Sequence, residues 1–224
     1  MTGAQGASVE VLSDAEAAAR RGAALIAEAA TDAVKARGSF AVALSGGRAP
    51  WRMVEMLRDF PIDWDVTEVF QVDERIAPEG DPDRNLTELV RHAPATALGR
   101  LRPMPVNGED LEAAAAKYAE ELPARLDLVH LGLGPDGHTA SLVPGDPVLD
   151  VTDRSVALTA NPYQDRRRMT LTYPALSAAR KVMWLVTGDE KRDALTKLLA
   201  GDPSIPAGRV ETTDSVLVTD VALG

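Results

Sequence analysis

Short runs rich in apolar residues recur along the chain and are separated by longer polar or mixed segments. The clearest runs cover residues 39–45, 66–73, 127–134, 181–188 and 215–223. Runs of this length, rich in Val, Leu and Ala and bounded by glycine or a polar residue, are typical of buried strands. Residues 156–159 and 169–172 predict two further short strands.

The segments between these runs are rich in Ala, Glu, Arg and Leu and predict helices. The predicted helices cover residues 14–36, about 50–60, a segment through 86–90, 109–122 and 189–199. We expect Ser13 or Asp14 to cap the first helix and Asp189 the last, while Pro50 suits the first turn of the second. Residues 79–85 predict a turn-rich loop.

Strands alternate with helices almost throughout, which predicts an α/β fold with a parallel or mostly parallel sheet and helices on both faces. No repeat of fixed period, low-complexity linker or shift in composition interrupts the chain. We therefore expect a single domain over residues 1–224, with a short mobile leader at about 1–8.

Composition and charge narrow the classes of function. The 224 residues include no cysteine, which excludes disulfides and thiolate chemistry and suits a reducing compartment. The formal net charge of −10 speaks against nucleic-acid binding, which needs a basic surface. No run of about 18 apolar residues predicts a membrane helix, and the first residues lack a secretory signal pattern. We expect a cytoplasmic protein.

In open α/β sheets, ligands bind beyond the carboxyl ends of the strands. The first such loop here is Ser45-Gly46-Gly47-Arg48, between a strand and a helix. Its glycines permit close approach to an anion, and the helix N-terminus and Arg48 add positive charge. The alternative is a tight turn that only needs glycine.

Charged residues also follow the strand at 66–73, where Asp73, Glu74 and Arg75 adjoin an apolar run. Charges next to a buried strand are costly unless they are paired or used in function. The structural alternative is an internal Asp–Arg salt bridge.

The richest loop reads Gly132-Leu-Gly-Pro-Asp-Gly-His-Thr-Ala-Ser141. Of the three histidines, His92 is expected on a helix surface, and His130 lies within an apolar run, as a satisfied core residue would. His138 stands at the ligand end of a strand, where an imidazole that exchanges protons near neutral pH is useful as a base. Asp136 precedes it by two residues. The alternative is a purely structural histidine.

Arg168 and Lys191 follow later strands and are ordinary solvated charges when taken singly. Together with Arg48 and Arg75 they supply the local positive cluster that a phosphate requires on an acidic protein.

These motifs, in this order, resemble the 6-phosphogluconolactonase family. The matching segments are SGGRAP, VDER with a downstream Asn, GLGPDGHTASLVPG, RMTLT and VTGDEKRDAL, and they span nearly the whole chain. The resemblance implies a Rossmann-like three-layer α/β/α fold, no metal and no cofactor, and hydrolysis of 6-phospho-D-glucono-1,5-lactone to 6-phosphogluconate in the pentose phosphate pathway. It also predicts a monomer whose partner is the small sugar-phosphate lactone.

The resemblance also assigns residues. His138 is expected to act as general base, oriented by Asp136, with Arg75 or backbone amides on the oxyanion. Ser45, Gly46, Gly47, Arg48, Arg168 and Lys191 are expected to bind the phosphate, and Asp73, Arg75 and Asp136 to line the sugar end. Two positions depart from the family pattern: Ala49 stands where Thr is frequent, and Arg84, before Asn85, stands where Ser is common. The part played by Asn85 stays open.

Two rival functions share some of these motifs. A glucosamine-6-phosphate deaminase shares the Asp73 position and the Gly-x-Asp-Gly-His loop, but there a carboxylate follows the histidine, whereas residues 139–145 here contain none. A non-catalytic sugar-phosphate sensor keeps the phosphate loop but is joined to a DNA-binding helix pair. No basic N-terminal module of that kind is present.

Overall fold

Two sheets make up the strand structure of the protein, whose computed structural model describes residues 4–223. The larger sheet has the order β1-β10-β9-β6-β2-β3-β5, and all its neighbouring strands pair in parallel. The predicted mostly parallel sheet is confirmed. Its strands, in chain order, are β1 (Ser8–Val11), β2 (Phe40–Leu44), β3 (Thr67–Gln71), β5 (Leu101–Arg102), β6 (Leu128–Leu131), β9 (Val182–Val186) and β10 (Ser215–Thr219).

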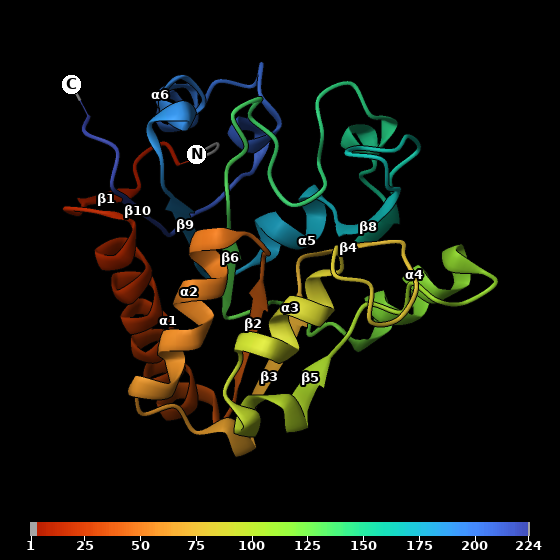
Figure 1. Cartoon of the computed structure of the whole chain (residues 1–224), viewed down its shortest axis with the longest axis horizontal. Helices are drawn as coiled ribbons and strands as arrows, with labels where there is room; N and C mark the ends of the chain where they lie inside the picture. Colours follow the sequence, from red (N-terminus) through yellow and green to blue (C-terminus); the bar gives the residue numbers. More distant parts are fainter. Residues whose placement is uncertain (1–3, 224) are drawn as a thin grey trace.

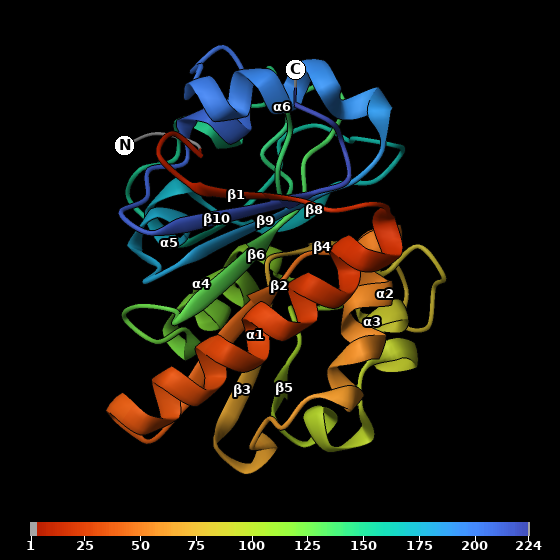
Figure 2. The same cartoon turned by 90° about the vertical axis from the view of Figure 1, so that its left-hand side faces the viewer.

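Helices cover both faces of this sheet, as the alternating pattern predicted (Figures 1 and 2). One face carries α1 (Ala15–Arg37), α2 (Arg48–Met56) and α3 (Asn85–His92). The other carries α4 (Leu111–Glu121), α5 (Tyr173–Ala178) and α6 (Arg192–Ala200). Short 3-10 helices span Leu57–Asp59, Trp64–Val66, Ala95–Arg100, Pro147–Asp150, Asp189–Lys191 and Pro206–Arg209.

Each face of the sheet has its own apolar core. On β9, Trp184 packs into the core beneath α4, α5 and α6, whereas Met183 and Leu185 pack into the core beneath α1, α2 and α3. Successive side chains of a strand point to opposite faces, so a strand covered on both sides must be apolar throughout. This explains why the central strands are continuous apolar runs in the sequence.

A smaller antiparallel sheet with the order β4-β8-β7 lies beside the larger one. Its strands are β4 (Asp73–Arg75), β7 (Val156–Leu158) and β8 (Arg168–Leu171). The predicted strand over 66–73 is therefore wrong at its end, because β3 stops at Gln71 and Asp73 begins β4. As a result Arg75 lies directly opposite Arg168, and both side chains reach the site from this second sheet.

Other differences from the sequence predictions lie at element ends. Residues 1–3 of the expected mobile leader lie outside the described residues, but Ala4 is buried and Ser8–Val11 pairs with β10 as β1. Asp14 caps α1 as predicted, accepting from Ala17 N at 2.8 Å. Asp189 is not a helix cap, because its carboxylate binds the Arg192 guanidinium.

The structure also corrects three smaller points. Pro50 is the third residue of α2 rather than the first, the last strand stops at Thr219, and α5 and β5 were not predicted. Both missed elements are short, and short elements carry little periodicity. Among residues 4–223, no helix combines the length and apolarity that crossing a membrane requires.

Candidate active site

A cavity of about 630 Å³ opens at the carboxyl ends of β2, β6 and β9. The loops that follow these strands form part of its wall. The rest comes from the smaller sheet, the start of α1, Asn85 and Asp220. The predicted site residues that line it are Ser45, Gly46, Gly47, Arg48, Asp73, Arg75, His138, Arg168 and Lys191. Asp136 does not line the cavity but contacts His138.

The loop between β2 and α2 leaves the first turn of α2 without a side-chain cap. Gly47 is the N-cap residue, with a φ of 134° that favours glycine. A Cβ on Gly46 would lie 2.3 Å from Asn85 Oδ1. The backbone of the turn thus requires Gly47, and the close approach of Asn85 requires Gly46. The turn leaves the helix amides and their partial positive charge available to an anion.

The backbone of Ser45, at the start of this loop, is hydrogen-bonded to the buried His130. The Ser45 amide donates to His130 Nδ1 at 3.3 Å. Burial lowers the pKa of His130 to about 3, so this imidazole stays neutral. His130 is a core residue as predicted, but not a satisfied one, because its Nε2 has no hydrogen-bond partner among residues 4–223. The Ser45 hydroxyl also has none within that range.

His138 and Asp136 form a hydrogen-bonded pair in the loop after β6. His138 Nδ1 lies 2.5 Å from Asp136 Oδ1, and the His138 amide also donates to that oxygen at 3.2 Å. The hydrogen bond from His138 is the main cause that lowers the pKa of Asp136 to about 2. The carboxylate is therefore ionised at neutral pH and fixes the Nδ1–H tautomer. Nε2 makes no protein hydrogen bond within residues 4–223 and is the nitrogen left to act.

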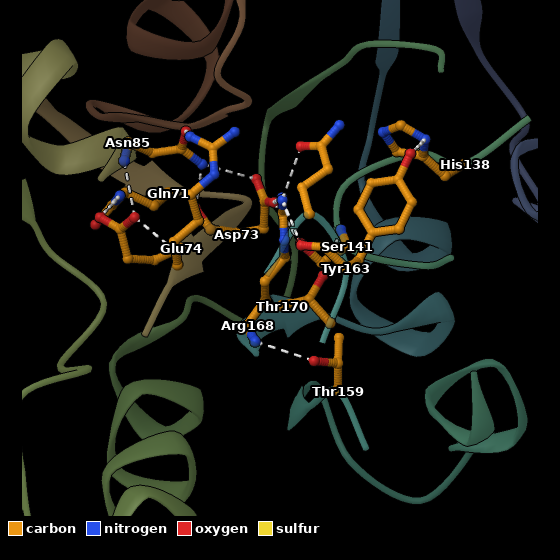
Figure 3. Close-up of polar contacts among 12 residues, drawn as sticks. Gln71, Asp73, Glu74, Asn85, His138, Ser141, Thr159, Tyr163, Arg168 and Thr170 are labelled. Atoms are coloured by element: carbon orange, nitrogen blue, oxygen red, sulfur yellow. Dashed lines mark hydrogen bonds and ion pairs between the residues drawn. The ribbon is translucent and has the colours of Figure 1, made fainter. Parts of the chain in front are cut away.

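Tyr163 is a third member of this group that the sequence did not reveal. Its hydroxyl lies 3.2 Å from Asp136 Oδ2 and 3.3 Å from His138 Nδ1, as Figure 3 shows for His138. The residue comes from the segment between β7 and β8, far from the histidine loop in sequence. The next residue in the chain, Gln164, lines the cavity.

Asp73 is buried at the centre of a second polar cluster (Figure 3). Ser141 Oγ donates to its Oδ2 at 2.6 Å, and Asn85 Nδ2 donates to its Oδ1 at 3.1 Å. An Arg168 nitrogen lies 3.8 Å from Oδ2. The ion pair considered from the sequence therefore exists, but its cation is Arg168, whereas Arg75 binds Asp83 O and Asn85 Oδ1. Asn85 thus belongs to the site, holding both Asp73 and Arg75.

Glu74, fully buried, organises the loop that carries Asn85. Its carboxylate accepts hydrogen bonds from the backbone amides of Asn85 and Leu86, both at 2.8 Å. Glu74, which lies in β4, therefore caps the N-terminus of α3. Arg84, one of the two departures from the family pattern, turns inward, with its Nε 3.5 Å from Glu74 Oε2. This buried pair explains why an arginine is accommodated at that position.

Arg52 and Arg168 of the cavity wall are ion-paired, with Glu16 and Glu55 and with Asp73 respectively, but other cations of the wall are not. Burial, and after it the nearby Arg48, lowers the pKa of Lys191, although Glu190 acts in the opposite direction. Burial likewise lowers the pKa of Arg168, with Arg75 adding to the effect and Asp73 opposing it. Within residues 4–223, Arg48, Arg75 and Lys191 have no carboxylate within 4.0 Å. Like charges held together on a partly buried wall are the arrangement that an anionic ligand stabilises.

The described part of the chain contains no group of three or more His, Asp or Glu side chains placed to hold a metal ion. The chemistry available at the site is that of an imidazole–carboxylate pair, a helix N-terminus and a set of guanidinium and ammonium groups.

Comparisons with known proteins show which proteins the chain is similar to. The family model described as glucosamine-6-phosphate isomerases/6-phosphogluconolactonase matches residues 13–219. A 6-phosphogluconolactonase of Streptomyces coelicolor is 36% identical, over 87% of this chain and 83% of its own. One from Nostoc is 34% identical over 97% of both chains. The crystal structure of the 6-phosphogluconolactonase from Thermotoga maritima superposes with a TM-score of 0.85 at 27% identity, covering 95% of this chain and 99% of the other.

Proposed function

The chain belongs to the glucosamine-6-phosphate isomerase and 6-phosphogluconolactonase family, and we propose that it hydrolyses 6-phospho-D-glucono-1,5-lactone to 6-phospho-D-gluconate in the oxidative pentose phosphate pathway. One observation carries this proposal. Within residues 4–223, Nε2 of the paired His138 has no hydrogen-bond partner, and it lies on the wall of a cavity that also holds Arg48, Arg75 and Lys191, which form no ion pair in that range. An imidazole base beside a group of cations suits a substrate that carries a phosphate and is hydrolysed by an activated water molecule.

In the proposed reaction, Nε2 of neutral His138 takes a proton from the water that attacks the lactone carbonyl carbon, C1. The bond from C1 to the ring oxygen then breaks, and the imidazolium returns the proton to that oxygen. Asp136 holds the ring through Nδ1 and stabilises the charge that forms on it. The Arg75 guanidinium or backbone amides stabilise the oxyanion. Ser45 is not a nucleophile in this scheme, since its hydroxyl has no hydrogen-bond partner within residues 4–223 that could take its proton.

We expect most of the substrate's binding energy to come from contacts with its phosphate group. The Ser45–Arg48 loop and the N-terminus of α2 would hold it together with Lys191 and Arg168, while Asp73 lines the sugar end. Contacts to a group remote from C1 position the carbonyl against the water without taking part in the chemistry.

The deaminase reaction of the same family is less well supported by these residues. Within residues 4–223, Asp136 is the carboxylate in contact with His138, and the segment 139–145 contributes none. Its polar members are used elsewhere: Thr139 Oγ1 donates to Gly132 O and Ser141 Oγ to Asp73.

A coupled assay tests the proposal. Glucose-6-phosphate dehydrogenase generates the lactone, and 6-phosphogluconate dehydrogenase follows product formation. We expect a rate well above spontaneous hydrolysis, with kcat about 10²–10⁴-fold lower in His138→Ala and little change in KM, as loss of a general base predicts. A folded H138A protein with near-normal kcat would exclude His138 as the base. No acceleration by the wild type would direct the search to amino-sugar phosphates, and then to ligand binding by calorimetry.

A further inference from the structure

Tyr163 touches both members of the His138–Asp136 pair, and the reaction described above does not use it. Its hydroxyl reaches Asp136 Oδ2 at 3.2 Å, while its ring meets the imidazole edge-on, with centroids 5.1 Å apart and planes at 61°. Figure 3 shows the phenol ring beside the imidazole of His138. An edge-on aromatic contact of this kind restricts the orientation of a ring as well as burying it.

The backbone places this tyrosine by a tight turn. Tyr163 and Arg166 pair across Gln164 and Asp165, whose φ values of 52° and 63° are those of a two-residue hairpin turn. The turn is tied to the rest of the protein, because Arg166 binds Asp81 at 3.1 Å in the loop before α3. Arg168 adds a second tie, donating to Tyr163 O at 3.2 Å.

Because the Asp136 carboxylate is ionised, the donor and acceptor of each hydrogen bond among Tyr163, His138 and Asp136 can be assigned. Asp136 only accepts, so His138 Nδ1–H points at Oδ1 and the Tyr163 hydroxyl donates to Oδ2. Among the described residues, the charged or titratable groups next to Tyr163 are Asp136 and His138 at its hydroxyl and the Arg168 guanidinium, which lies 5.3 Å from the ring centroid. Burial, followed by the negative charge of Asp136, raises the pKa of Tyr163 and keeps it a donor at neutral pH.

We propose that Tyr163 is a positioning residue for the lactonase reaction, acting through Asp136. Its hydroxyl occupies the carboxylate oxygen that His138 does not use, and its ring fixes the plane of the imidazole, so that Nε2 faces the water. The hydroxyl also draws part of the carboxylate charge away from the imidazolium. This inference rests on the proposed function, because it concerns how the same base is held.

The test compares Tyr163→Phe with the wild type in the coupled assay. Phenylalanine keeps the ring and removes the donor, so we expect kcat to fall about 3–10-fold with KM within about twofold. Loss of the donor leaves more carboxylate charge for the imidazolium, so the pH at which kcat/KM falls to half its plateau on the acid side rises by about half a unit. Tyr173→Phe is the matched control: its hydroxyl donates to Pro206 O at 2.9 Å, and Tyr173 does not line the cavity.

A double-mutant cycle shows whether Tyr163 acts through Asp136. In an Asp136→Asn background, Y163F should lower kcat by less than about twofold, because the acceptor it orients has lost its charge. Additive effects of the two changes would overturn the proposal, and so would a Y163F enzyme with wild-type kcat and acid limb. If the wild type itself does not hydrolyse the lactone, the proposed function fails; if it does and Y163F is unchanged, only this inference fails.

Discussion

A single methyl group at Gly134 is expected to disable the base without unfolding the protein. A Cβ built there lies 2.0 Å from His138 Nδ1, 2.1 Å from Cε1 and 2.7 Å from Asp136 Oδ1. The closest ordinary Cβ contacts are about 3.4 Å, so the imidazole must retreat by more than about 1 Å. Gly134 has no positive φ, so alanine imposes no backbone strain of its own. A displacement of this size costs about 10²-fold in rate.

Gly134→Ala should therefore lower kcat in the coupled assay by about 10²-fold. KM should change little, since the proposed phosphate contacts lie elsewhere. The thermal midpoint should stay within a few degrees, because the imidazole is partly exposed and can turn away. Gly99→Ala is the control: Gly99 is exposed, has nothing within 4 Å of its Cβ and does not line the cavity. A G134A enzyme with wild-type kcat would refute the view that His138 in this position is the base.

Two further predictions concern the cations and the pair itself. Lys191→Ala and Arg168→Ala should each raise KM far more than they lower kcat, and an unchanged KM in both would exclude the phosphate assignment. Of the two variants, only R168A should also lower the thermal midpoint, because it leaves the buried Asp73 without its ion pair. The folded-state pKa of Asp136 lies below its ordinary value of 3.8, at about 2, so its stabilising contribution is complete above pH 3.8 and is lost as the pH falls to about 2. The difference in thermal midpoint between the wild type and D136N should shrink over that range, and a constant difference would contradict the assignment.

The main sheet and its helices were predictable because their signals are local. A strand buried on both faces must be an apolar run, and β2, β6 and β9 are buried at every position. The sequence pattern was least informative where one continuous segment contributes strands to both sheets. Residues 66–73 have the pattern of one strand in the sequence, yet the chain passes from β3 to β4 at Val72. This change of sheet leaves no mark on the hydrophobic pattern.

The site divides in the same way. The glycine loops were predictable, since glycine is needed where another group occupies the place of a Cβ, as Asn85 does at Gly46 and His138 does at Gly134. The partners of Asp73 were not, because Ser141 is 68 positions away along the chain. A serine or asparagine within a loop has many structural uses, and only the fold shows which carboxylate it meets.

Tyr163 marks the limit of sequence reasoning most clearly. Its turn carries Gln164 and Asp165 in the left-handed region, where Asn, Asp or Gly is the usual choice, so the Gln-containing pair gives a weak turn signal. The hydroxyl meets Asp136 because the antiparallel pairing of β7 with β8 brings the segment between them beside the loop after β6. The contact therefore depends on a strand pairing and a loop position that no local pattern in residues 156–171 specifies, although the residues that meet there are plain in the sequence.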